Sequence, residues 1–204
     1  MEEILSMNPR PDFVEVITWN DAGESHYIGN IWGEGYNPQE LAYGNVQDWP
    51  HFGWQSLVAS FIDAFKSGKD SSSMFPASGQ KPAGAMWYRT FPKNASCSED
   101  PMGRPNGAGS AVDSVNFAVA VPTSAHGYTL VVTSGTTKLQ TFTLQPGLNY
   151  AAVPGLNMGT QRADIYAPNS NTPALSAAGG HAVTSEPSLP SNICNFNFQV
   201  VPFT

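Results

Sequence analysis

Residues 13–27 read Phe-Val-Glu-Val-Ile-Thr-Trp-Asn-Asp-Ala-Gly-Glu-Ser-His-Tyr, and this stretch governs both the expected fold and the expected chemistry. Its first half, residues 13–19, is an apolar run interrupted only by Glu15, which is typical of a strand buried on both faces of a parallel sheet. The strand would end where an Asn-Asp-x-Gly turn sequence begins. Loops that follow such strands commonly carry catalytic groups on a rigid scaffold.

Two carboxylates, Asp21 and Glu24, lie in that loop at positions i and i+3. Hydrolysis of an acetal needs one carboxyl group that protonates the leaving oxygen and a second that attacks or activates water. The pair meets this need. A structural interpretation stays open beside it, in which Asp21 caps the backbone amides of a turn and Glu24 is solvated. Sequence spacing alone favours this second interpretation, because acid pairs three apart are common.

Aromatic side chains crowd residues 1–90, and sugars dock their C–H faces on aromatic rings while polar neighbours bind the hydroxyl groups. Some of these rings belong to the core, and Trp54, on a predicted helix, is one of them. The two histidines of this region can hydrogen-bond a substrate, although structural roles are as common for isolated histidines. The candidate substrate-binding residues are Trp19, Asn20, His26, Tyr27, His51, Trp87, Tyr88 and Arg89.

The composition narrows the class of partner. Nine Lys and Arg residues face sixteen Asp and Glu residues, giving a net charge of −7, which argues against nucleic acid and anionic membranes as partners. Charged residues make up only 12% of the 204 residues, whereas Gly and Pro are plentiful. This balance is typical of secreted, β-rich, carbohydrate-active proteins, and we expect a monomer that needs no cofactor.

The N-terminal residues lack the cationic start and apolar segment of a signal peptide, and no apolar run reaches the ~18 residues of a membrane span. Two cysteines, Cys97 and Cys194, are able to form one disulfide in an oxidising compartment, but two cysteines alone do not establish pairing. Asn94 begins an Asn-Ala-Ser glycosylation sequence, a short motif that also arises by chance. No histidine or cysteine pair has the spacing of a metal site.

A helical stripe follows the first strand. Apolar residues recur from Trp54 to Phe65 at i, i+3, i+4, i+7, i+8 and i+11, and Gly68 stands where a C-terminal cap belongs. Residues 84–90 then form a short apolar and aromatic strand. Strand, loop, helix and strand together predict a right-handed crossover between parallel strands. Residues 92–110, rich in Pro, Gly, Asn and Ser, read as a linker, with a domain boundary near residue 105.

Beyond that boundary the pattern becomes all-β, with short alternating segments separated by Gly and Pro turns, which suggests an antiparallel sandwich. The predicted strands are residues 115–121, 128–133, 139–144, 150–153, 162–166, 181–184 and 196–201. The expected fold is therefore α/β plus all-β, with one domain over residues 1–105 and a β-sandwich over residues 106–204.

Three motifs in order resemble glycoside hydrolase family 71, the fungal endo-1,3-α-glucanases called mutanases. The first is Pro-Asp-Phe-Val-Glu-Val-Ile-Thr-Trp-Asn-Asp-x-Gly-Glu-Ser-His-Tyr-Ile-Gly, residues 11–29, the second Pro-His-x-Gly-Trp, residues 50–54, and the third Ala-Met-Trp-Tyr-Arg-Thr, residues 85–90. The resemblance continues through residues 111–116 and 153–156 and so covers essentially the whole chain.

This resemblance implies a (β/α)8 catalytic barrel followed by a β-sandwich, and inverting hydrolysis of α-1,3-glucan, a polysaccharide of fungal cell walls. It also implies a secreted or wall-bound enzyme in which the acids of Trp-Asn-Asp-x-x-Glu are catalytic. Carried onto this chain, Glu24 is the general acid and Asp21 the base that orients water. Ala22 and Phe52 depart from the family pattern, so contacts to the sugar are expected to differ there.

Length is the larger departure, since a barrel of this type needs about 250 residues and eight strands. The chain offers two barrel-like strands before its sandwich begins, so we expect a C-terminal remnant of the barrel that is inactive alone. A non-catalytic carbohydrate-binding or structural β-sandwich protein is the alternative.

Overall fold

The computed structural model covers residues 1–204 and describes residues 1–23, 26–33, 35–187 and 192–204. Its α-helices are α1 (Glu2–Ser6), α2 (Pro38–Tyr43) and α3 (Gln55–Lys66), and its 3₁₀ turns are η1 (Phe52–Trp54), η2 (Ser71–Ser73) and η3 (Ala108–Ser110). Its strands are β1 (Ala83–Arg89), β2 (Ser114–Val121), β3 (Thr129–Ser134), β4 (Thr137–Thr143), β5 (Gly147–Pro154), β6 (Gln161–Tyr166), β7 (Leu175–Ala178) and β8 (Phe198–Pro202).

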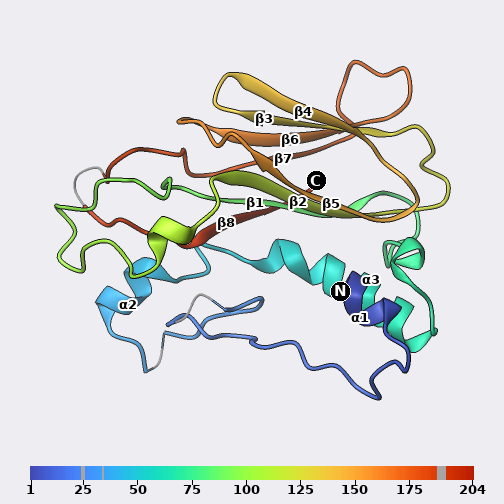
Figure 1. Ribbon diagram of the computed structural model, residues 1–204, viewed down its shortest axis with the longest axis horizontal. Coiled ribbons are helices and arrows are strands. Elements are labelled where there is room, and N and C mark those ends of the chain that lie inside the picture. The colour runs from blue at the N-terminus through green and yellow to red at the C-terminus, as the bar shows by residue number, and fades with distance from the viewer. Residues whose placement is uncertain (24–25, 34, 188–191) are drawn as a thin grey trace.

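Two four-stranded sheets dominate the fold, with strand orders β5-β2-β1-β8 and β4-β3-β6-β7. We call them the first and the second sheet. All strand pairs named in the described part of the chain are antiparallel. In Figure 1 the second sheet lies above the first, while α1 and α3 lie against the opposite face of the first sheet. The observed chain is therefore β-rich, with the helices on one side.

The main core fills the space between the two sheets because alternate strand residues point inward. From the first sheet, the core takes Met86 and Tyr88 of β1 and Val115, Phe117, Val119 and Val121 of β2. From the second sheet it takes Leu130 and Val132 of β3 and Ala163 and Ile165 of β6. This inward set includes the alternating residues from which strand 115–121 was predicted, and that strand is confirmed as β2.

The helix predicted from the apolar stripe is confirmed as α3, which begins one residue later because Trp54 belongs to the preceding 3₁₀ turn. Its buried Phe61 and Ala64 pack with Leu5 of α1 and with Met74 in a second, smaller core. Gly68 has a φ of +68°, the left-handed conformation expected just beyond a helix C-terminus.

The strand predicted over residues 13–19 is wrong. This segment has no regular secondary structure, and Phe13 and Ile17 are 80% and 70% exposed. A strand buried on both faces needs neighbours that take its backbone hydrogen bonds, and no described strand pairs with this segment. An apolar, β-branched run permits such a strand, but the partner strands decide whether it forms.

The strand predicted over residues 84–90 is confirmed as β1, but its predicted neighbours are wrong. β1 pairs antiparallel with β2 and with β8, so Met86 lies opposite Phe117 on one side and Val201 on the other. The parallel crossover is therefore absent from the described structure. The boundary near residue 105 stays a prediction, although β1, which precedes it, completes a sheet with strands that follow it.

Most of the strands predicted beyond residue 105 are present within a few residues of their expected bounds. Residues 181–184 are the exception, because they contribute only an isolated bridge between Val183 and Gly159. The second sheet is completed instead by β7, which sequence reasoning missed. Its Leu-Ser-Ala-Ala sequence lacks the β-branched and aromatic residues on which strand prediction depends.

The segment predicted as a linker, residues 92–110, is anchored rather than loose. Cys97 and Cys194 form a disulfide with a Cα–Cα distance of 5.6 Å, so the pairing that the sequence left open is present. Beside it the buried carboxylate of Asp100 accepts hydrogen bonds from the Tyr43 hydroxyl at 2.8 Å and the Cys194 amide at 2.7 Å. These contacts fasten α2, the linker segment and the approach to β8 to one another.

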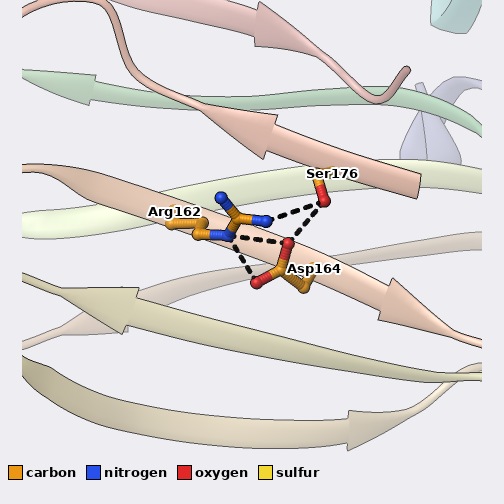
Figure 2. Close-up of polar contacts among 3 residues, drawn as sticks. All are labelled: Arg162, Asp164 and Ser176. Atoms are coloured by element: carbon orange, nitrogen blue, oxygen red, sulfur yellow. Dashed lines mark hydrogen bonds and ion pairs between the residues drawn. The ribbon is translucent and has the colours of Figure 1, made fainter. Parts of the chain in front are cut away.

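A polar cluster lies on the second sheet, on the side away from the core (Figure 2). The Nε of Arg162 donates to both carboxylate oxygens of Asp164 at 2.9 and 2.7 Å, and its Nη2 donates to the hydroxyl of Ser176 at 3.1 Å. That hydroxyl donates in turn to Asp164 at 2.6 Å. Arg162 and Asp164 share a face of β6 because they are two residues apart, and the cluster joins β6 to β7.

Candidate functional site

The loop that carries the candidate acids is closed by hydrogen bonds across its base. The amide of Thr18 donates to the carbonyl of His26 at 2.9 Å, and the amide of His26 donates to the carbonyl of Asp21 at 3.1 Å. The Thr18 hydroxyl donates to the same His26 carbonyl at 2.8 Å and accepts from the Asp21 amide at 3.1 Å. The loop therefore holds Asp21 and His26 close together. Glu24 lies outside the described residues.

His26, at the end of this loop, lines a cavity of about 690 Å³. The cavity lies on the face of the first sheet that is turned away from the main core. Trp87 and Arg89 of β1 form part of its floor, together with Asn116 of β2 and Phe198 of β8. Residues 105–108 and 110–112 line another side. His26 of the acid loop lines the cavity, whereas Asp21 is not among the described residues of its lining.

Strand alternation explains which β1 side chains reach the cavity. Trp87 and Arg89 are two residues apart and share one face, whereas Tyr88 between them points into the core between the sheets. The hydroxyl of Tyr88 donates to the carbonyl of His181, and burial raises the pKa of Tyr88. The structure thus separates Tyr88 from the two neighbours with which it was predicted to bind a substrate.

Arg89 supplies positive charge to the cavity. Its guanidinium carbon lies 4.4 Å from the centre of the Phe198 ring, within the range of a cation–π contact. Burial lowers the pKa of Arg89 and the negative charge of Asp113 raises it, yet a guanidinium stays protonated in proteins. With an indole ring and the Asn116 amide beside it, the cavity offers groups that bind hydroxylated ligands. No carboxylate belongs to its described lining.

The loop ends at a buried aromatic pair, Tyr27 and His51. Their rings are stacked with centres 4.0 Å apart, and Nδ1 of His51 lies 2.8 Å from the Tyr27 carbonyl oxygen. Nε2 of His51 lies 3.2 Å from the Phe198 carbonyl oxygen, and burial lowers the pKa of His51. A neutral imidazole carries one N–H, which we place on the shorter contact.

The Tyr27 hydroxyl completes this buried network. It donates to the Trp49 backbone carbonyl at 2.5 Å and accepts from the side-chain amide of Asn197 at 2.9 Å. Burial raises the pKa of Tyr27 to about 12. Neither Tyr27 nor His51 lines the cavity. Both are buried, and in this arrangement their hydrogen bonds hold the end of the loop in place.

The other two predicted binding residues lie at the base of the loop. Trp19 is 52% exposed, and its ring fills the space beside Gly29, where an added Cβ would come within 2.2 Å of it. The backbone carbonyl of Asn20 accepts a 3.4 Å hydrogen bond from the Tyr36 hydroxyl. The structure thus brings His26, Trp87 and Arg89 together at one cavity and leaves Trp19 and Asn20 out of its described lining.

Sequence reasoning missed the polar groups of β2. Asn116 donates from its side chain to the Trp87 carbonyl at 3.2 Å and accepts from the Ser114 hydroxyl at 3.0 Å. The signal was available, because Asn116 alternates with the inward-facing Val115 and Phe117 and so points to the opposite face. Phe198 gave no such signal, since only the antiparallel pairing of β8 with β1 brings it beside Arg89.

Within the described ranges, no three His, Cys, Asp or Glu side chains are grouped so that they would hold a metal ion. The described helices include none that is long and apolar enough to cross a membrane.

Comparison with known proteins gives a family match over the whole chain: the family model described as "Glycosyl hydrolase family 71" matches residues 1–204. The chain is 36% identical over 157 residues to "Glucan endo-1,3-alpha-glucosidase agn1" of Schizosaccharomyces pombe, which covers 74% of this chain and 32% of that protein. It is 36% identical over 137 residues to "Mutanase Pc12g07500" of Penicillium rubens, covering 66% of this chain and 27% of that protein.

A third relative, "Ascus wall endo-1,3-alpha-glucanase" of Schizosaccharomyces pombe, is 28% identical over 203 residues, covering 93% of this chain and 43% of that protein. The chain thus spans between about a quarter and a half of the length of these curated relatives. No solved structure matches it.

Proposed function

Because the chain belongs to glycosyl hydrolase family 71, we propose that it provides an acid pair and a sugar-binding cavity for the hydrolysis of α-1,3-glucosidic bonds in α-1,3-glucan. The observation that carries the proposal is the family match over residues 1–204, which includes both the acid loop and the cavity. The names of the relatives, glucan endo-1,3-alpha-glucosidase and mutanase, support a glycosidase.

In the proposed mechanism, Glu24 protonates the glycosidic oxygen that leaves, and Asp21 accepts a proton from the water that attacks the anomeric carbon. Inversion follows when the water enters from the face opposite the leaving group. The two carboxyl groups of inverting glycosidases lie about 6.5–9.5 Å apart, which leaves room for that water. His26, whose backbone amide donates to the Asp21 carbonyl, connects Asp21 to the cavity.

The cavity would hold the sugar units next to the cleaved bond. The indole of Trp87 offers a flat apolar surface to the C–H face of a glucose ring, and Arg89 and Asn116 offer hydrogen-bond donors to its hydroxyl groups. An uncharged polysaccharide also suits a chain with a net charge of −7, which would repel acidic polymers.

We extend the proposal to architecture and location. The two packed sheets, β1 included, are proposed to form the β-sandwich that accompanies the catalytic barrel in this family, with the segment that precedes β1 as part of that barrel. One relative is named for the ascus wall, and the Cys97–Cys194 disulfide suits an oxidising compartment, so we propose a secreted or wall-associated monomer.

Activity is best tested in a segment-swap chimaera, in which this chain replaces the matching region of the Schizosaccharomyces pombe glucosidase. Release of reducing sugar from α-1,3-glucan is measured for the chimaera and for its Asp21→Asn and Glu24→Gln variants. Each variant should lose at least about 100-fold in rate, the usual contribution of a general acid or base. Asp12→Asn and Glu15→Gln, two exposed acids of the same segment, are the charge-matched controls and should leave the rate unchanged.

Near-parental rates in both the Asp21→Asn and Glu24→Gln chimaeras would remove the catalytic assignment. The 204-residue chain alone should release no reducing sugar, because residues 13–19 lack the flanking strands that would hold the acids in place. Steady turnover by the isolated chain would show that this support is unnecessary.

The second candidate function is carbohydrate binding without hydrolysis, favoured by the absence of a carboxylate from the described lining of the cavity. Retention of the isolated chain on insoluble α-1,3-glucan tests it. Trp87→Ala and Arg89→Ala should each reduce retention, whereas Trp32→Ala, which removes an exposed indole outside the described cavity lining, should not. Equal retention of all three variants would show that the cavity does not bind the polymer.

A further inference from the structure

We propose that Asn94 is a site of N-linked glycosylation. In this reaction the side-chain nitrogen of Asn94 attacks C1 of the first sugar of a lipid-linked oligosaccharide donor. A bond from Nδ2 to C1 forms, the bond from C1 to the pyrophosphate oxygen breaks, and the lipid pyrophosphate leaves as the amide gives up one proton. The proposal does not depend on the proposed catalytic function.

Asn94 begins the Asn-Ala-Ser sequence of residues 94–96, and no other Asn-x-Ser or Asn-x-Thr sequence without Pro at x occurs in the 204 residues. The sequence alone is a weak signal, because so short a motif often arises by chance. The structure adds the exposure of Asn94 and the geometry of its turn, which distinguish an accessible sequon from one that is buried in the fold.

The local backbone turns the Asn94 side chain outward. The amide of Ala95 donates to the carbonyl of Pro92 at 2.9 Å, which closes a tight turn with Asn94 at its corner. Asn94 and Ser96 are both exposed, whereas Ala95 between them is only 5% exposed and packs against the disulfide. Within the described structure the Asn94 side chain makes no hydrogen bond, so attachment of a sugar breaks none.

The disulfide does not yet hold this turn at the time when a transferase would act on it, because Cys194 is synthesised after Cys97. Cys97 cannot pair until Cys194 has been made, 97 residues later. At a synthesis rate of about 5–20 residues per second, that delay is roughly 5–20 s. During it the Asn-Ala-Ser sequence is not yet held by the disulfide and is free to take the extended form that a transferase binds. The disulfide itself indicates the oxidising compartment in which such transfer occurs.

The glycan would stand next to the cavity of the candidate functional site. The amide of Lys93 donates to the Asp113 carboxylate at 2.8 Å, and the guanidinium of Arg104 donates to the Lys93 carbonyl. These contacts join the turn that carries Asn94 to Arg104 and Asp113, the residues on either side of segment 105–112, part of which lines the cavity. A sugar on Asn94 therefore projects from a loop beside the cavity without replacing any group of its lining.

The test is secretion of the full 204-residue chain from a yeast host, followed by intact-mass measurement before and after treatment with an endoglycosidase. Peptide mapping after enzymatic release of the glycan in ¹⁸O-water then locates the site, because release converts the linked asparagine to labelled aspartate. We expect one glycan per chain, located on Asn94. Asn94→Gln and Ser96→Ala should abolish the mass shift, Ser96→Thr should keep it, and Asn106→Gln, at an exposed asparagine outside any such sequence, should not affect it.

Two results would overturn the proposal: secretion of the disulfide-bonded chain at its unmodified mass, or a labelled aspartate at any other asparagine. Mapping on the parent chain decides the question even where a variant is not secreted.

Discussion

Replacement of Asp100 by alanine should destabilise the folded chain more than its place in a Gly- and Pro-rich segment would suggest. The carboxylate is 5% exposed and accepts the Tyr43 hydroxyl at 2.8 and 3.0 Å, the Cys194 amide at 2.7 Å and the Met102 amide at 2.8 Å. It thus ties α2 and the approach to β8 to the disulfide.

The loss in free energy of unfolding depends on which hydrogen-bond donors are able to bind water once the Asp100 carboxylate is removed. Cys194 is fully buried, so its amide would be left without an acceptor, which costs about 2 kcal/mol for a donor that had bonded to a charged group. Tyr43 and Met102 lie nearer the solvent, and their donors recover part of their hydration, at about 0.5 kcal/mol each. Asp100→Ala should therefore lower the free energy of unfolding by about 3 kcal/mol.

An isosteric change gives a second, independent value. Each carboxylate oxygen of Asp100 accepts one backbone amide, Oδ1 from Met102 and Oδ2 from Cys194. Asparagine keeps only one oxygen, so one amide loses its acceptor whichever way the side-chain amide turns. Asp100→Asn should accordingly cost about 1–2 kcal/mol, less than the alanine variant.

Urea unfolding under non-reducing conditions, followed by tryptophan fluorescence, measures these differences. Glu99→Ala is the matched control, since it removes the same charge from an exposed neighbour. A loss of less than about 0.5 kcal/mol in Asp100→Ala, or an equal loss in Glu99→Ala, would refute the idea that the buried hydrogen bonds stabilise the fold.

Three further predictions concern other parts of the fold. Burial raises the pKa of Tyr27 from 10.0 to about 12, so the folded chain keeps a proton that the unfolded chain has lost between these pH values. The free energy of unfolding should fall as the pH rises through this window, by up to about 1.4 kcal/mol per pH unit, and Tyr27→Phe should remove this part of the slope in urea titrations at several pH values. The double change Cys97→Ala and Cys194→Ala should cost about 2–5 kcal/mol, because the bridge closes a loop of 97 residues, and a loss below about 1 kcal/mol in non-reducing urea would contradict this. Gly84→Ala would place a Cβ 2.1 Å from a backbone oxygen of β2 and should cost about 2–4 kcal/mol by thermal unfolding, whereas Gly180→Ala, whose Cβ meets nothing closer than 3.5 Å, should be nearly neutral.

Local sequence patterns predicted the elements that bury one face against a core. The apolar stripe of residues 54–65 gave α3, and the alternation of Val115, Phe117, Val119 and Val121 gave β2, because each pattern records which face of the element is buried. The same alternation separates Trp87 and Arg89 from Tyr88. That separation was missed because the strand was assumed to belong to a parallel sheet buried on both faces.

Local sequence patterns gave wrong or incomplete predictions where residues far away in the chain decide whether a segment is paired or buried. Residues 13–19 have the composition of a buried strand, but no described strand pairs with them, and Phe13, Val16 and Ile17 stay exposed. Asp100 lies in the segment predicted as a linker, yet its carboxylate is buried against Tyr43 and Cys194. Nothing local to either segment records those neighbours.

By itself, then, the sequence determined the helix, most of the strands and the family resemblance, since all of these depend on local spacing and residue type. Only the tertiary structure decided that β1 pairs antiparallel with β2 and β8, and that His26, Trp87 and Arg89 meet at one cavity while Tyr27, His51 and Tyr88 turn away from it. The physical reason is that hydrogen bonding between strands and the burial of side chains depend on residues far apart in the chain, whose approach no local pattern specifies.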